Sequence, residues 1–105
     1  MTRHYTLQDA TERSPVMVKV WAPKACNNDF VCRAIIDGLH VQSKELLIRG
    51  IDTMQASYLT LLVVSAELYG VGQPTGRHVY WHVPGDDLGL PVPDTIVDLV
   101  RGRLS

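Results

Sequence analysis

The residues best suited to chemistry lie in the last third of the chain, in the stretch RHVYWHVPGDD. A strand over residues 77–83 would place His78, Tyr80 and His82 on one face, because side chains alternate across a strand. At roughly 3.3 Å per residue the two histidines stand about 13 Å apart, too far to share one metal ion with bonds of about 2 Å. The pattern therefore indicates a partner-facing strip or a half-exposed strand face, and no metal site.

Four aspartates follow at positions 86, 87, 94 and 98, with no basic residue among them. Such carboxylates could hold a metal ion for hydrolysis, but no HExxH motif or comparable spacing accompanies them, so we expect no metal and no cofactor. On a chain of net charge −1, an acidic surface suits a basic partner. The alternative is a merely solvated face. The residues that we expect to bind a partner are His78, Tyr80, Trp81, Asp86, Asp87 and Asp98.

The remaining composition argues against other classes of function. Cys26 and Cys32 do not form a CxxC pair, and no signature ties Cys26 to a histidine or aspartate, so we expect free thiols and no nucleophile. Residues 1–16 have no apolar signal segment, and a pI of about 6.4 gives no positive field for nucleic acid. We expect a cytoplasmic, non-enzymatic protein; in a secreted one, a single Cys26–Cys32 bridge is the alternative.

The elements that position these residues follow from hydrophobic periodicity over a length of 105 residues, which suits a single domain over residues 1–105. Strands are predicted over residues 4–8, 16–22, 29–37, 40–48 and 77–83. Gly38 after Asp37 predicts a hairpin turn. The predicted fold class is α+β: an antiparallel meander of four to five strands packed on one long central helix, with a short C-terminal helix capped by Asp94.

The long helix is predicted to begin at Asp52, and no charged side chain follows until Glu67. Asp52 can accept hydrogen bonds from the first turn while Gln55 reaches back, which makes a capping box. The uncharged run is shorter than the roughly 20 residues that a bilayer requires, so no membrane span is expected. Because the helix is apolar on more than one stripe, it must be covered on one side by the sheet and on the other by the C-terminal segment or a partner chain.

Between the fourth strand and this helix lies the motif GIDTMQA, residues 50–56. It resembles the Gly-Val-Asp-Ser-Leu-Gln-Ala-like signature of a small bacterial family of uncharacterised domains, over about residues 3–70. The matching positions are Gly50, Asp52, Gln55 and Ala56, for which the pattern predicts a turn, a cap, a capping-box partner and close helix packing. The resemblance implies the meander and the helix, and it implies no activity.

More loosely, a small α+β domain with an acidic face resembles the immunity proteins that bacteria keep against secreted toxins. That resemblance implies a non-enzymatic inhibitor, of immunity or antitoxin type, that occludes a partner such as a basic toxin domain. Two alternatives stay open. One is a homo-oligomeric structural or accessory domain, so that the chain is a monomer or a homodimer, and the other is a small hydrolase or ligand-binding enzyme.

Overall fold

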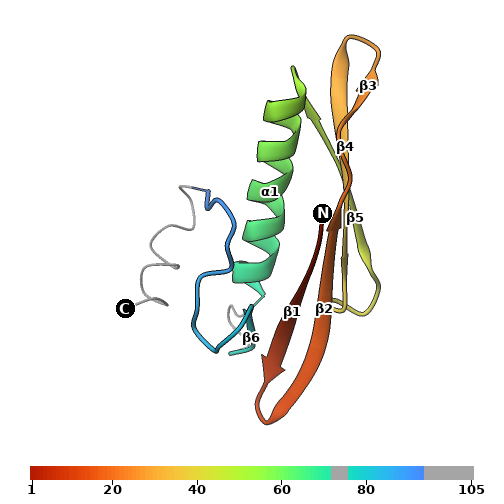
Figure 1. The fold of residues 1–105 in the computed structure, drawn as a ribbon. Coiled ribbons are helices and arrows are strands. Elements are labelled where there is room, and N and C mark those ends of the chain that lie inside the picture. The colour runs from red at the N-terminus through yellow and green to blue at the C-terminus, as the bar shows by residue number, and fades with distance from the viewer. Residues whose placement is uncertain (72–75, 94–105) are drawn as a thin grey trace.

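The computed structural model describes residues 1–71 and 76–93, which form an antiparallel sheet and one helix (Figure 1). The strands are β1 (Thr2–Asp9), β2 (Glu12–Val20), β3 (Lys24–Cys26), β4 (Asp29–Asp37), β5 (Lys44–Gly50) and β6 (His78–Tyr80), and the helix is α1 (Thr53–Gly70). The α+β class is confirmed, but the prediction of four to five strands is wrong, because β3 is a sixth. The predicted pair of one long and one short helix is not observed, because α1 is the single helix of the described residues. The segment predicted as the short C-terminal helix, from Asp94 onwards, lies outside them.

The sheet is a meander in which two strands, β2 and β3, together line one edge of β4. β1 pairs with β2, β2 pairs with the second half of β4, and β3 pairs with the first half of β4, so β2 and β3 lie along the same edge. Pro23 separates these two strands because proline has no amide hydrogen for the ladder. Asn27, with φ of 56°, turns the chain from β3 into β4. β5 lies on the other edge of β4, and β6 returns to β1.

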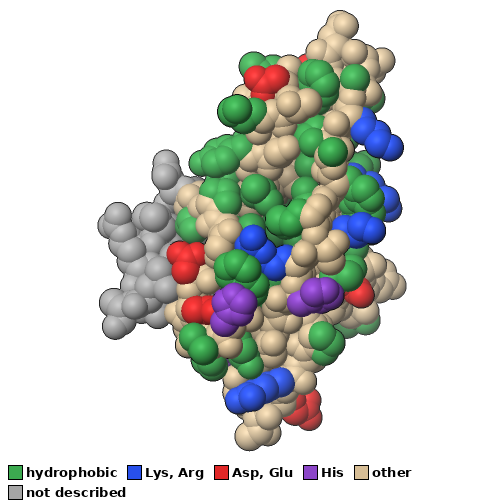
Figure 2. Space-filling view, viewed as in Figure 1, with side chains coloured by type: hydrophobic (Ala, Val, Ile, Leu, Met, Phe, Trp, Pro, Cys, Tyr) green, Lys and Arg blue, Asp and Glu red, His purple; other side chains and the backbone are tan. Residues whose placement is uncertain are grey.

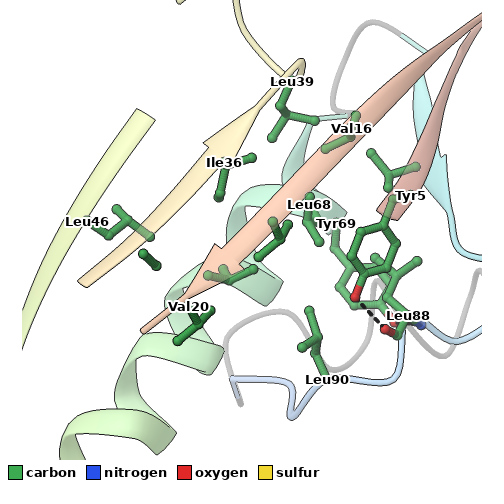
Figure 3. Packing of buried hydrophobic residues seen from close by; sticks show 14 of the residues in the cluster. Tyr5, Val16, Val20, Ile36, Leu39, Leu46, Leu68, Tyr69, Leu88 and Leu90 are labelled. Atoms are coloured by element: carbon green, nitrogen blue, oxygen red, sulfur yellow. Dashed lines mark hydrogen bonds between the residues drawn. The ribbon is translucent and has the colours of Figure 1, made fainter. Parts of the chain in front are cut away.

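One face of this sheet, the inner face, packs against α1 to form the core (Figures 1 and 3). From β1 to β5, its buried apolar residues are Tyr5, Leu7, Val16, Val18, Val20, Cys32, Ala34, Ile36 and Leu46. The helix meets them with Ala56, Thr60, Val64 and Leu68, all 0% exposed and spaced four residues apart. This spacing keeps them on one side of the helix, and the small ones among them let the helix lie close to the strands.

The GIDTMQA motif makes the junction between β5 and α1. The predicted cap at Asp52, its partner Gln55 and the close packing of Ala56 are confirmed. The predicted turn at Gly50 is wrong, because Gly50 is the last residue of β5. The Gln55 amide donates to Asp52 Oδ1 at 2.7 Å, and the Gln55 side chain accepts from the Ile51 amide at 2.7 Å. A Cβ on Gly50 would lie 2.3 Å from the Ala56 backbone nitrogen, so only glycine fits there without a backbone shift. Gly50 therefore lets the strand end pass directly beneath the first turn of the helix.

A strap, residues 81–93, crosses the side of α1 that faces away from the sheet (Figure 1). Leu88 is fully buried, and its backbone is held at both groups: the Tyr5 hydroxyl donates to the carbonyl at 2.8 Å, and the amide donates to the Tyr69 hydroxyl at 3.1 Å (Figure 3). Burial raises the pKa of Tyr5, so this hydroxyl keeps the proton that it donates. The strap thus covers the second side of the C-terminal half of α1.

The N-terminal half of α1 is less completely covered by the described residues. Met54 is 80% exposed and Tyr58 is 52% exposed.

Among the described residues, no helix is long and apolar enough to cross a membrane.

Candidate functional site

The residues that the sequence predicted for partner binding lie in β6 and at the start of the strap. β6 ends at Tyr80, so the predicted strand over residues 77–83 is shorter than expected. His78 is half-buried, while Tyr80 is only 7% exposed and offers little surface to a partner. The Trp81 ring is stacked between the Arg3 guanidinium, 4.1 Å from the ring centroid, and the His82 imidazole, at 4.4 Å. Trp81 therefore helps to hold the strap against β1.

The predicted acidic residues of the strap bind its own backbone. The Asp86 carboxylate accepts hydrogen bonds from the amides of Trp81, His82 and Val83 at 2.7 to 3.1 Å. Asp87 accepts from the Gly89 amide at 2.7 Å. Aspartate commonly closes turns in this way, and both carboxylates here have a structural role beside any role in recognition. Asp98 lies outside the described residues.

The second face of the sheet, the open face, carries a different group of side chains. In the described part of the chain, α1 and the strap lie on the inner face and no element lies on the open one (Figure 1). Alternation brings apolar and basic side chains to it from β2, β4 and β5. Those that share the open face across the paired strands are Met17, Lys19, Trp21, Lys24, Val31, Arg33, Ile35, Leu47 and Arg49.

Trp21 is the centre of this open face. The Arg33 guanidinium carbon lies 4.4 Å from the Trp21 ring centroid, and the Lys19 ammonium nitrogen lies 4.8 Å from it. Cations over an indole face are attracted by the negative potential of the ring. A hollow of about 280 Å³ opens beside the ring, and it is lined by Trp21, Ala22, Lys24, Cys26, Val31, Arg33 and Leu47. The arrangement can accept one apolar side chain beside exposed positive charges.

Comparison with protein families gives a match over most of the chain. A family described as a domain of unknown function (DUF6968) matches residues 1–92. The chain belongs to this family. No curated protein and no solved structure matches it.

The DUF6968 match extends from β1 to the strap, so it includes both faces of the sheet. It supports the expected membership of an uncharacterised domain family. The immunity-protein resemblance receives no support from it. The function of this DUF6968 domain must therefore be argued from its own surfaces.

A second group of polar residues joins the start of β5, and the loop before it, to α1. Glu67, the single charged residue of the helix, accepts a hydrogen bond from Lys44 Nζ at 2.5 Å and lies 3.4 Å from His40 Nε2. Partial burial alone would raise the pKa of Glu67, but the hydrogen bonds and the charges of Lys44 and His40 together outweigh it and leave the pKa lowered. A carboxylate held in its ionised form suits an ion pair better than proton transfer near neutral pH, so we interpret the group as a tie between loop and helix.

The described residues place no group of three or more His, Cys, Asp or Glu side chains where they could hold a metal ion. Both thiols are free: Cys32 is buried and lies 3.4 Å from the Trp21 carbonyl oxygen, and Cys26 lines the hollow beside Trp21.

The Trp21 hollow was not predicted from the sequence. The strands that carry Arg33 and Leu47 were predicted, but β3, which contributes Lys24 and Cys26, was not. The strands over residues 16–22 and 29–37 assign Trp21 and Arg33 to definite faces, but their registers are needed to show that the two faces coincide. The available signal was the mixture of bulky apolar and basic residues on one face of each strand, Met17, Lys19 and Trp21 on the first and Val31, Arg33 and Ile35 on the second. Such a mixture indicates a surface that is neither core nor ordinary solvated face.

Proposed function

We propose that this DUF6968 domain is a non-enzymatic protein-binding module and that the open face around Trp21 is its contact surface. The observation that carries the proposal is the half-buried indole between two cations, on a sheet face that no described element covers. Tryptophan and arginine are the residues most enriched among those that dominate protein interfaces. Leu47, 61% exposed beside them, adds apolar area that water solvates poorly.

The narrower class that we propose is an inhibitor of immunity or antitoxin type, acting in the bacterial cytoplasm by occluding a partner protein. A small domain with a preformed, rigid sheet face suits such a role, because little conformational entropy is lost on binding. Asp86 and Asp87 already bind backbone amides, so we assign recognition to the open face in place of the acidic strap.

A photo-crosslinking amino acid at position 47 tests the proposal in cells of the native host. We expect a discrete adduct that mass spectrometry identifies, and we expect Trp21→Ala to abolish it. The same amino acid at Val41, a fully exposed loop position away from the open face, is the matched control. The identified protein must then bind the purified domain with an affinity that falls in Trp21→Ala. Equal adducts at positions 41 and 47 would reject the open face as the contact surface.

A homo-oligomeric accessory domain is the second candidate, favoured by the N-terminal half of α1. Ile51 is 72% exposed there, next to the exposed Met54 and Tyr58. Hydrophobic side chains gather over α1 and in the hollow beside it (Figure 2). This hollow has a volume of about 460 Å³. Exposed apolar patches of this kind commonly mark interfaces. Sedimentation of the wild type and of Met54→Glu tests it: a wild type that remains monomeric at high concentration removes this candidate.

A further inference from the structure

The charges around Trp21 are unevenly balanced. Arg33 forms an ion pair with Glu45 at 2.8 Å, whereas neither Lys19 nor Lys24 forms an ion pair within residues 1–71 and 76–93. All three cations lie against the Trp21 ring or line the hollow beside it. The hollow therefore presents a local excess of positive charge, although the whole chain has a net charge of −1.

The apolar side of the hollow is placed directly between these cations. In the β-sheet register Arg33 pairs with Leu47, and Lys24 pairs with Val31. Paired residues on one face of a sheet have neighbouring side chains. An apolar side chain seated against Val31 and Leu47 would thus have a cation on either side.

We propose, resting on the protein-binding function above, that the ligand of the open face is an acidic protein segment. One apolar side chain of this segment enters the hollow beside Trp21, and flanking carboxylates pair with Lys24 and with Lys19 or Arg33. Pairing with Arg and Lys on a partly desolvated aromatic surface gives such a segment both orientation and selectivity.

A single-stranded nucleic acid could also stack on an indole flanked by cations. The open face favours protein because it also carries the carboxylates of Asp29, Asp37 and Glu45. A phosphate backbone has one charge per nucleotide along its whole length and must pass near them. A peptide can place its carboxylates at the cations alone and neutral residues elsewhere.

Three fluorescent peptide libraries test the proposal with the intact chain. Each has a central Leu, Ile, Phe or Trp, and the flanking positions are Asp and Glu in the first, Asn and Gln in the second, and Lys and Arg in the third. By fluorescence anisotropy, we expect peptides from the acidic library to bind about tenfold tighter than their neutral counterparts, which corresponds to one or two charge-assisted contacts. Equal binding of the acidic and neutral libraries would overturn the proposal.

Two pairs of variants locate the binding. Lys24→Glu should weaken acidic peptides about tenfold, whereas Arg13→Glu, with the same change in charge, should not. Arg13 lies on β2 six residues before Lys19, roughly 20 Å along the strand. Leu47→Asp should abolish binding, and Val41→Asp should leave it unchanged. All four positions are exposed, so circular dichroism should show folded proteins.

The remaining outcomes separate this proposal from the function on which it rests. If the crosslink at position 47 forms but acidic peptides do not bind, the protein-binding function stands and the acidic ligand is wrong. If a fluorescent oligothymidylate binds more tightly than the acidic peptides and Lys24→Glu abolishes it, the ligand is nucleic acid and both proposals fall. If neither peptides nor a crosslinked protein bind at the open face, both fall as well.

Discussion

The two faces of the sheet carry apolar side chains and meet opposite environments. On the inner face Val16, Val18 and Ile36 are at most 1% exposed beneath α1 and the strap. On the open face Met17, Trp21 and Ile35 are half-buried, and the Trp21 ring is partly covered by the basic side chains of Lys19 and Arg33. Long cationic side chains can lie over apolar surface while their charges stay in water. The charged side chains therefore keep the open face solvated, and its apolar area stays available for contact with a partner.

Hydrophobic content alone therefore does not define a core. The inner face excludes water because a helix with small residues fits onto it, together with Leu88 and Leu90 of the strap. The open face has aromatic, aliphatic and charged side chains that a packed core could not bury without a large desolvation cost. Substitutions that act unequally on the two faces test this distinction.

The largest effect is expected at the junction of β5 with α1. Gly50→Ala places a Cβ 2.3 Å from one Ala56 backbone atom and 2.7 Å from another, so the helix must shift. We expect the free energy of unfolding to fall by about 3 kcal/mol or more, measured by urea denaturation. Gly70→Ala is the matched control: apart from its chain neighbours and the backbone of its own helix, no atom of the described residues lies within 4 Å of its Cβ, and it should be neutral or stabilising.

Truncation of one leucine in the core and of one leucine on the open face should show directly how much each contributes to stability. Leu68→Ala, in the core, should lower the free energy of unfolding by about 2–5 kcal/mol because it leaves a cavity. Leu47→Ala, on the open face, should lower it by less than about 0.5 kcal/mol. Thermal and urea denaturation of both variants provide the measurement. Similar losses would mean that the open face is part of the core and not a surface for contact.

A smaller loss is expected from the strap. Tyr5→Phe removes the hydroxyl that donates to the Leu88 carbonyl and leaves that buried carbonyl without this donor. The free energy of unfolding should fall by about 1–1.5 kcal/mol. Amide hydrogen exchange should accelerate at Leu88, whose amide is bonded to Tyr69, more than in β4. Equal acceleration in both places would show that the strap unfolds only with the whole domain.

A still smaller loss than in the strap is expected at the rim of the inner face. The folded-state pKa of Glu67 is lowered, so its ionised form stabilises the protein above the unfolded-state pKa, and this contribution is lost as pH falls through the folded-state value. Glu67→Gln should cost about 0.5–1 kcal/mol at pH 7, and less as the pH falls below about 4. Denaturation across this range measures it, and a cost that does not change with pH would contradict the ion pair.

Much of the fold was predictable because its signals are local. The predicted strand over residues 29–37 is the observed β4, and the predicted helix begins at the Asp52 cap with the Gln55 capping-box bond. The short β3 was missed because three residues after Pro23 carry no measurable alternation. The strand after α1 ended earlier than predicted because Asp86 turns the chain back at Trp81 through hydrogen bonds that no periodicity reveals.

The class of fold, the alternation that sorts each strand into two faces, and the capped helix that covers one of them follow from local sequence patterns. The surroundings of Trp21 depend on the three-dimensional arrangement of the strands. Lys19 is close to Trp21 in the sequence. Arg33 and Leu47 are distant in the sequence, and the registers of β4 and β5 bring them beside Trp21. The register of each strand pair is set by how the whole inner face packs against α1. That packing depends on residues far apart in the sequence, so no single segment specifies it.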